Sequence, residues 1–241
     1  MTVCVVIPAL NEAESIGAVL AALPANLVDE VIVVDNGSTD GTGVRALAAG
    51  ARVVREARRG YGYACAAGVA ATQADIVVFL DADLSDFPEE IEALLAPLVA
   101  GQADLALGSR LLAGSIPASA MPPQQRFGNW LASRLMQRLY GLSVTDLSPF
   151  RAVRRELLLA LDMREMTYGW PTEMMVKAAR RGYRLVEVPV RYRARYAGRS
   201  KVSGTVRGAI LAAYFILGTT LRYAWQRVDP PSLQVNAKRD T

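Results

Sequence analysis

The chain has 241 residues, of which 52% are hydrophobic and 21% are charged, so it contains enough apolar material for a substantial core. Its formal net charge of +4 is compatible with phosphate-bearing ligands or an anionic membrane surface, and it is too small to indicate nucleic acid. The absence of histidine excludes any catalytic triad, metal ligand or general base that depends on imidazole. Cys4 and Cys65 form no Cys-x-x-Cys pattern, so we expect two core thiols and no disulfide framework or zinc site.

The first predicted strand, residues 3–7, starts almost at Met1. No basic and apolar leader segment precedes it, which is expected of a chain that stays in the cytoplasm. Strands and helices then alternate, with strands at residues 3–7, 31–34, 52–54, 76–80 and 104–108 and helices at residues 14–23, 41–49, 62–72 and 88–100. This order predicts an α/β fold, a mostly parallel central sheet with helices on both faces.

Polar residues follow the first two predicted strands. Asn11 and Glu12 come just before the first helix, and Asp35 ends the second strand ahead of a glycine turn. A carboxylate at that place resembles the ribose-reading position of a nucleotide-binding fold. The Gly-x-Gly-x-x-Gly pattern is absent, which disfavours a Rossmann dinucleotide site. Polar residues 38–40 alternatively serve only to cap the next helix.

The fourth strand ends in two aspartates. Residues 76–80 are apolar and β-branched without alternation, which is typical of a strand buried on both faces of a parallel sheet. Ligands bind beyond the carboxyl ends of such strands, where Asp81 and Asp83 would converge on one Mg²⁺ or Mn²⁺ that also holds a diphosphate. The alternative is that Asp83 or Ser85 caps the helix that begins at Pro88.

The second half of the chain is less regular. Strands are expected at residues 148–153 and 185–191, and helices at residues 125–140, 156–161 and 171–181. Beyond the last strand comes a basic run with interleaved tyrosines, which contains Arg191, Arg193, Arg195, Arg199 and Lys201. It is interpreted as a mobile loop that closes over phosphate groups and excludes water.

The apolar stretch at residues 206–225 predicts a helix. Its uncharged part, residues 208–221, is shorter than the roughly 20 residues that cross a bilayer. Aromatic and arginine residues near its ends suit the membrane interface. Packing on the domain or on a second copy of the chain is the alternative.

Seven motifs occur in order over residues 5–201 and read PALNE, VVDNGSTDGT, ARRGYGYACAAG, VVFLDADLSDFPEEI, LGSR, DLSPFR and GYRLVEVPVRYRARYAGRSK. Together they resemble the family 2 glycosyltransferases with a GT-A fold, specifically the dolichol-phosphate and polyprenyl-phosphate sugar synthases. The resemblance implies a nucleotide-sugar donor, a divalent cation at the Asp-Ala-Asp triplet and inversion at the anomeric carbon by direct displacement.

The resemblance also implies roles for individual residues. The nucleotide-sugar site would consist of Pro8, Asn11, Glu12, Asp35, Arg59 and Asp81. Asp81 and Asp83 would hold the metal, and Arg199, Ser200 and Lys201 would form the loop at the acceptor and diphosphate. Asn36 and Ser85 depart from the pattern of many relatives, so the third protein ligand of the metal stays open between Asp86 and water.

The chemistry of transfer suggests further candidates. Arg110 after the fifth strand and Arg126 at the start of a helix would neutralise the departing diphosphate. A phosphate acceptor is already anionic and needs no general base. A hydroxyl acceptor requires a carboxylate base, for which Asp146 and Glu173 are the candidates; Glu173 is alternatively a first-turn acid that complements the helix dipole.

These patterns together predict a GT-A domain at residues 1–204, an apolar helix at 205–227 and a polar tail at 228–241. The predicted enzyme moves a hexose from a UDP- or GDP-linked sugar to polyprenyl phosphate, as a peripheral protein on the cytoplasmic membrane face, with a homo-oligomer through the helix as an open alternative. The rival functions are transfer to a saccharide or other hydroxyl, nucleotidyl transfer with the same acidic pair, and donor sensing without turnover.

Overall fold

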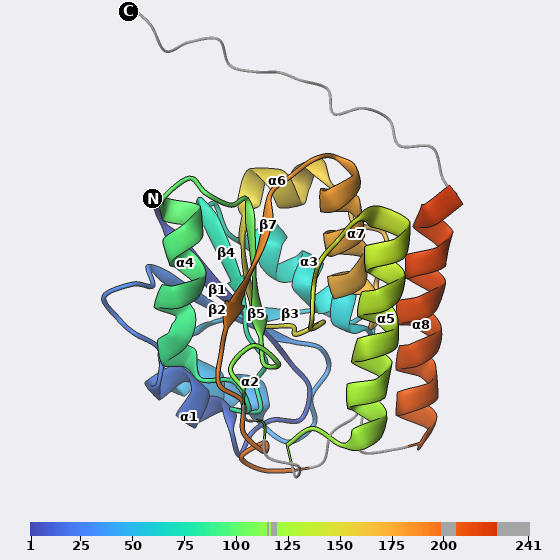
Figure 1. Ribbon diagram of the computed structural model, residues 1–241. Helices are drawn as coiled ribbons and strands as arrows, with labels where there is room; N and C mark the ends of the chain where they lie inside the picture. The colour runs from blue at the N-terminus through green and yellow to red at the C-terminus, as the bar shows by residue number, and fades with distance from the viewer. Residues whose placement is uncertain (115, 117–119, 199–205, 226–241) are drawn as a thin grey trace, which may run out of the picture.

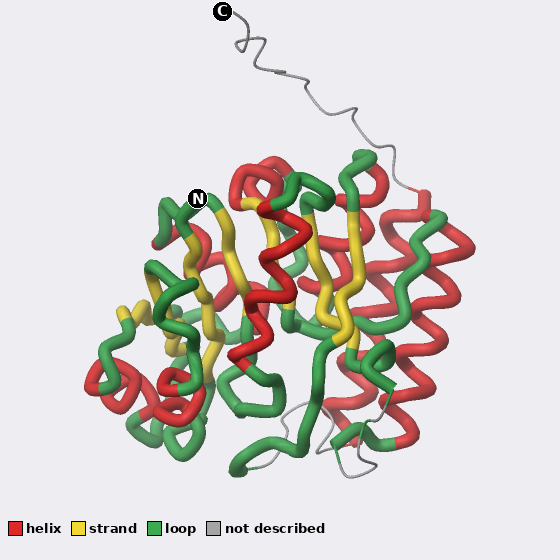
Figure 2. Tube along the Cα trace, turned by 60° about the vertical axis from the view of Figure 1, so that its left-hand side comes forward, coloured by secondary structure: helices red, strands yellow, loops and turns green. Residues whose placement is uncertain are grey.

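The computed structural model describes residues 1–114, 116, 120–198 and 206–225. In this part of the chain a seven-stranded sheet forms the central layer, in the order β3-β2-β1-β4-β6-β5-β7 (Figures 1 and 2). The strands are β1 Val3–Ala9, β2 Glu30–Asp35, β3 Arg52–Arg55, β4 Ile76–Phe79, β5 Leu105–Ser109, β6 Arg151–Arg154 and β7 Leu185–Pro189. Only β6 is antiparallel to its neighbours within the described sheet, so the prediction of a mostly parallel α/β sheet is confirmed.

Helices cover both faces of the sheet (Figure 2). The helices are α1 Ile16–Ala21, α2 Thr42–Ala48, α3 Tyr61–Ala71, α4 Ile91–Val99, α5 Pro123–Tyr140, α6 Arg155–Ala160, α7 Trp170–Arg180 and α8 Val206–Trp225. One core cluster joins the sheet to α1, α2 and α4, and a second joins the opposite face to α3, α5, α6 and α7. All four residues of β4 are buried, as its unbroken apolar sequence predicts.

Several element boundaries differ from the sequence prediction. The helix expected at 88–100 begins with a 3₁₀ turn, Pro88–Glu90, before α4. The strand expected from residue 148 begins only at Arg151, because Pro149 has no N–H to donate to a sheet ladder. The strand expected to reach residue 191 ends at Pro189, since the N–H of Arg191 donates to Glu90 at 2.7 Å instead.

Helix α3 packs closely on the sheet at Gly68. A Cβ added there would overlap Cγ1 of Val6 on β1 and would lie 3.2 Å from Cγ2 of Val34 on β2. Glycine therefore lets the helix backbone approach two central strands, both of which end at the loops described below. Cys4 and Cys65 are buried free thiols, as expected.

Replacement of Gly68 by alanine is expected to lower the free energy of unfolding by about 1–3 kcal/mol, the usual cost of overpacking. Gly128→Ala is the matched control, because a Cβ at this helical glycine meets nothing within 4 Å. The control should be neutral or stabilising by up to about 1 kcal/mol through its helix propensity. Urea unfolding of the two variants measures the difference; equal stabilities would contradict the close approach of α3.

The C-terminal helix α8 packs beside α5 and α7 (Figure 1). Its contacts are partly polar: the hydroxyl of Tyr223 donates to Glu173 of α7, and the hydroxyl of Tyr140 on α5 donates to the carbonyl of Thr220. Within the described residues, no helix combines the length and apolar character needed to cross a membrane. The packing alternative for this helix is thus observed, at least for one of its faces.

Candidate active site

The loops that follow β1 and β2 are hydrogen-bonded to each other. The N–H of Thr39 donates to Oδ1 of Asn11 at 2.8 Å, and the N–H of Asn11 donates to the hydroxyl of Ser38 at 3.0 Å. Asn11 has a φ of 50°, a left-handed conformation that asparagine tolerates better than most residues. β1 and β2 are parallel neighbours, so the loops at their carboxyl ends meet at one edge of the sheet.

A second set of contacts brings Arg59 to the same edge. The side-chain amide of Asn36 donates to the carbonyls of Glu56 and Arg58 at 3.0 and 2.7 Å, and its oxygen accepts from the N–H of Gly60 at 2.9 Å. A Cβ on Gly37 would lie 3.3 Å from Nε of Arg59, so this side chain extends over the loop after β2. The side chain of an aspartate at position 36 would have no N–H to donate to these carbonyls, which explains the amide at this departure from the family pattern.

Asp35 and Pro8 lie at the ends of these paired strands. Pro8 is opposite Val34 in the ladder, and the carboxylate of Asp35 accepts from the N–H of Ser38 at 2.8 Å. After the turn, Asp40 accepts from the N–H of Thr42 at 3.0 Å, while the N-cap position of α2 is Gly41, which makes no side-chain cap. Asp35 is therefore a turn-stabilising side chain at the carboxyl edge.

Asp81 and Asp83 follow β4 at the same edge of the sheet. Oδ1 of Asp83 accepts from the N–H and the hydroxyl of Ser85 at 2.9 and 2.6 Å, while the 3₁₀ turn at Pro88 has no side-chain cap. The capping alternative is therefore not observed. Burial, together with the charge of Asp83, raises the pKa of the Asp81 carboxyl to about 7.

The chemistry of this pair fits a hard divalent cation. Asp81 makes no hydrogen bond or ion pair with the described part of the chain, so its oxygens are available, and a cation would favour the ionised form that burial opposes. No three acidic or cysteine side chains among the described residues are grouped to hold a metal. Two carboxylates, completed by water and phosphate oxygens, are a usual environment for Mg²⁺.

Asp86 is buried and only 2% exposed, and neither carboxylate oxygen has a hydrogen-bond partner in the described residues. Burial, with a contribution from Asp81, raises the pKa of Asp86 well above its usual value. Among the described residues, the structure does not group Asp86 with Asp81 and Asp83 as a set of three acidic ligands.

Arg195 joins the acidic residues from the far end of the chain. Its Nη2 lies 2.7 Å from Oε1 of Glu12, 2.8 Å from Oε2 of the same carboxylate and 3.7 Å from Oδ2 of Asp83. Burial opposes the charge of Arg195, but the hydrogen bond to Glu12 and the charges of Glu12, Asp83 and Asp81 together outweigh it and raise the pKa of the guanidinium. We refer to Glu12, Asp81 and Asp83 as the acidic cluster.

Arg110 and Asp146 form a buried ion pair next to this cluster. Nε and Nη2 of Arg110 each donate to an oxygen of Asp146 at 2.7 Å, and the two residues are only 4% and 1% exposed. The amide of Asn129 on α5 donates to Oδ1 of Asp146 at 2.7 Å. Despite its burial, Asp146 has a lowered pKa because Arg110 stabilises its charge, so the carboxylate stays ionised and holds Arg110 in place.

The remaining predicted residues lie elsewhere or are not described. Arg126, on the first turn of α5, donates to the carbonyls of Ile116 and Met121 at 2.9 and 3.3 Å. Glu173 lies between α7 and α8, where it accepts from the N–H of Glu165 at 2.7 Å and pairs with Lys177 at 2.7 Å. It is therefore not with the acidic cluster. Arg199, Ser200 and Lys201 lie outside the described residues.

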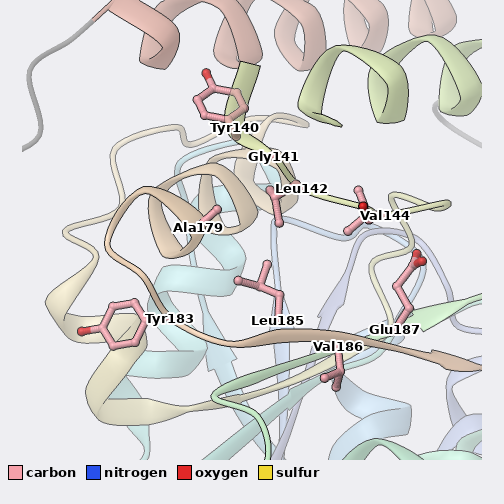
Figure 3. A pocket seen from close by; sticks show the side chains of 10 residues that line it. Tyr140, Gly141, Leu142, Val144, Ala179, Tyr183, Leu185, Val186 and Glu187 are labelled. Carbon is pink, nitrogen blue, oxygen red and sulfur yellow. The ribbon is translucent and has the colours of Figure 1, made fainter. Parts of the chain in front are cut away.

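Three residues of this region had no individual role in the sequence prediction: Asn36, Asn129 and Arg195. Asn36 and Arg195 belong to motifs that the sequence displays, but the motifs do not identify their partners. Asn129 lies on a helix between two exposed aromatic residues, and nothing in the sequence connects it with Asp146. A cavity of about 320 Å³ lies away from the cluster, lined by Tyr140, Leu142, Tyr183, Leu185 and Glu187 among others (Figure 3).

Comparison with known proteins identifies the family. Residues 4–161 match the model of glycosyl transferase family 2. An uncharacterized glycosyltransferase of Mycobacterium bovis is 44% identical over 87% of this chain and 94% of its own length. A dolichyl-phosphate hexose transferase of Haloferax volcanii is 37% identical over 86% of this chain and 89% of its own length.

Among solved structures, the fold resembles glucosyl-3-phosphoglycerate synthase from Mycobacterium tuberculosis in complex with Mn²⁺, uridine diphosphate and phosphoglyceric acid. The TM-score is 0.76 at 30% identity, and the match covers 95% of this chain and 80% of the other. The mostly parallel sheet is that of the GT-A fold. The chain therefore belongs to the family 2 glycosyltransferases and resembles the polyprenyl-phosphate sugar synthases among them.

Proposed function

We propose that this glycosyltransferase moves a hexose from a UDP- or GDP-linked sugar to a polyprenyl phosphate. A phosphate oxygen of the acceptor attacks the anomeric carbon, the bond from that carbon to the diphosphate oxygen breaks, and the nucleoside diphosphate leaves. One displacement inverts the configuration of the sugar. The observation that carries the proposal is that Arg110 is held by Asp146 beside the acidic cluster, which offers a fixed positive charge to an anionic reactant.

The donor side of the proposal rests on the shared edge of β1, β2 and β4. Asn11, Asp35 and Arg59 surround the loops where the nucleoside would bind, and Asp81 and Asp83 would hold Mg²⁺ or Mn²⁺. When bound, such a cation neutralises the charge that develops on the leaving diphosphate. The solved relative in complex with Mn²⁺ and uridine diphosphate supports a nucleotide donor and a divalent cation.

The proposal of a phosphate acceptor rests on the contacts of the two candidate general bases, Asp146 and Glu173. Asp146 is bound by Arg110 and Asn129, and Glu173 is bound by Lys177 in the contact with α8. Arg110 holds the pKa of the Asp146 carboxyl below its usual value, which makes Asp146 a weak proton acceptor, whereas Glu173 lies away from the acidic cluster, in the contact between α7 and α8. Polyprenyl phosphate needs no base, since its attacking oxygen is already ionised near neutral pH.

Transfer to a hydroxyl is the second candidate, favoured by the likeness to glucosyl-3-phosphoglycerate synthase with phosphoglyceric acid bound. One assay separates the two. Radiolabelled UDP- and GDP-sugars are incubated with Mn²⁺ and either polyprenyl phosphate or phosphoglyceric acid, and label is counted in organic and aqueous products. Organic-extractable label supports the proposal, whereas product formed only with phosphoglyceric acid overturns it in favour of the second candidate.

We also propose that α5 and α8 lie against the membrane that contains the acceptor. α8 buries Thr219, Thr220 and Tyr223 against the domain, while Tyr214 is 70% exposed. Ile210 and Trp225 of the same helix are also 63% and 77% exposed, so large apolar side chains lie on its outer face. The first residues of both helices lie at the end of the molecule to which the parallel strands point their carboxyl ends (Figure 1).

Aromatic residues on α5 extend this surface. Phe127 and Trp130 are exposed on its first turns, with their ring centroids 5.7 Å apart. Arg134 and Arg138 are exposed on the same helix and suit anionic headgroups. Aromatic side chains beside arginine are typical of the interface between water and lipid.

Trp130→Glu is expected to weaken binding to phosphatidylglycerol vesicles by about tenfold, because a carboxylate replaces an interfacial aromatic ring. Trp130 is 55% exposed, so the folded protein should keep its stability. Leu47→Glu on α2, where the leucine is 65% exposed, is the matched control and should bind like the wild type. Vesicle co-sedimentation measures the partition; equal loss in both variants would argue against this surface.

A further inference from the structure

The backbone after β7 fixes Arg195 in place against the acidic cluster. The N–H of Arg193 donates to the carbonyl of Ser85 at 3.0 Å, and the N–H of Tyr196 donates to the carbonyl of Asp83 at 2.9 Å. An antiparallel bridge also joins Tyr192 to Asp86. The segment 192–196 therefore runs alongside residues 83–86, and the position of Arg195 is set by the main chain as well as by its own charge.

The guanidinium of Arg195 bridges two members of the cluster. One nitrogen, Nη2, contacts both oxygens of Glu12 and lies 3.7 Å from Asp83, and the side chain of Arg195 is 18% exposed. The carboxylates of Glu12 and Asp83 repel each other, so they come together only where a positive charge compensates them. A cation bound by Asp83 and the guanidinium that faces Asp83 would compete for the same negative charge.

We propose that Arg195 is a built-in counter-ion of the metal site, which exchanges partners when the metal binds. Without metal it neutralises Glu12 and Asp83; with metal its guanidinium is released to the diphosphate of the donor. The inference rests on the proposed function, from which it takes the cation and the diphosphate. It implies that metal alone binds weakly and that metal and nucleotide strengthen each other.

A nearby arginine, Arg191, provides a control. Arg191 pairs with Glu89 and Glu90 at 3.1 and 2.5 Å, on the exposed surface away from Glu12 and Asp83. Arg191→Met therefore removes the same charge and the same hydrogen-bonding group next to the segment 192–196 without touching the cluster. It should bind metal and nucleotide like the wild type.

The test measures Mn²⁺ binding in the absence of nucleotide. Electron paramagnetic resonance of the unbound Mn²⁺ reports the fraction that is bound. Arg195→Met should lower the Mn²⁺ dissociation constant at least about fivefold, because a competing charge is gone. The same variant should bind UDP or GDP in the presence of Mn²⁺ at least about fivefold more weakly, because a diphosphate partner is lost. In the wild type, the Nε–H resonance of Arg195 should shift on titration with Mg²⁺, and that of Arg191 should not.

An unchanged or weaker Mn²⁺ affinity in Arg195→Met overturns the inference, as does the absence of Mn²⁺ binding in both proteins. Tighter Mn²⁺ binding with an unmoved Arg195 resonance also overturns it, since simple charge repulsion then accounts for the affinity. Failure of the proposed function is seen separately, in the products of the wild-type transfer assay. If Arg195 competes with the metal but the transfer assay shows a hydroxyl acceptor, the inference about Arg195 stands and the proposal of a polyprenyl phosphate acceptor is rejected.

Discussion

Asp83→Asn is expected to reduce sugar transfer by about a thousandfold, because the leaving diphosphate loses a cation that is worth several kcal/mol in the transition state. The substitution leaves the fold intact, since an asparagine oxygen can still accept from the N–H and hydroxyl of Ser85 as Oδ1 of Asp83 does at 2.9 and 2.6 Å. Initial rates with saturating donor and acceptor, together with Mn²⁺ affinity, measure the effect. The transfer rate and the Mn²⁺ affinity should both fall.

The matched control is Glu92→Gln, which removes one negative charge from an exposed position on α4. It should transfer sugar at the wild-type rate, within about twofold, because an exposed charge outside the site acts only through screened long-range fields. Activity of Asp83→Asn within tenfold of the wild type, or wild-type turnover that survives chelation of divalent cations, would reject the metal-assisted reaction.

Asp146→Asn is expected to lower the free energy of unfolding by about 3–5 kcal/mol, the usual cost of leaving one partner of a buried ion pair without the other. Arg110 is 4% exposed and both of its 2.7 Å side-chain contacts are with Asp146, so little water reaches the guanidinium to replace the lost carboxylate. Urea denaturation at pH 7 measures the change. Asp162→Asn is the control: its pair with Arg164 is exposed, and its loss should cost less than about 1 kcal/mol.

The pH dependence of this contribution to stability follows from the direction in which the pKa of Asp146 is shifted in the folded protein. The pKa of Asp146 is lowered from its usual 3.8, so its stabilising contribution is present above that pH and is lost as the pH falls through the lower value in the folded protein. The deficit of Asp146→Asn should accordingly shrink in strong acid. An equal cost for the buried and exposed pairs, or a general-base limb in the pH–rate profile that disappears in Asp146→Asn, would contradict the assignment of Asp146 to holding Arg110.

The sequence predicted well where the signal was local. The apolar run of β4 and the carboxylates that follow it placed Asp81 and Asp83 at the carboxyl edge of a parallel sheet, and the structure has them there. Predicted boundaries failed where a contact distant in sequence ended the element, as at Arg191, whose N–H donates to Glu90. Such a partner, 101 positions away, leaves no periodic pattern.

The candidate bases illustrate the other limit. A sequence does not distinguish a carboxylate that is free to accept a proton from one that is held by a cation. Both candidate bases are held: Asp146 pairs with Arg110, and Glu173 pairs with Lys177. Arg110 is 36 residues from Asp146, and Tyr223 is 50 residues from Glu173. The same holds for Arg195, whose sequence context indicated only a basic loop.

By itself, the amino-acid sequence determined the α/β class, the alternation of strands and helices, the family and the place of the two aspartates, because each follows from the order of neighbouring residues. The tertiary structure alone decided which charges meet: Arg110 with Asp146, Glu173 with Lys177 and Tyr223, and Arg195 with Glu12, which is 183 residues away. The physical reason is that the ionisation of a carboxylate depends on its burial and on charges within a few ångströms, and the folded chain brings those charges together without regard to their separation in sequence.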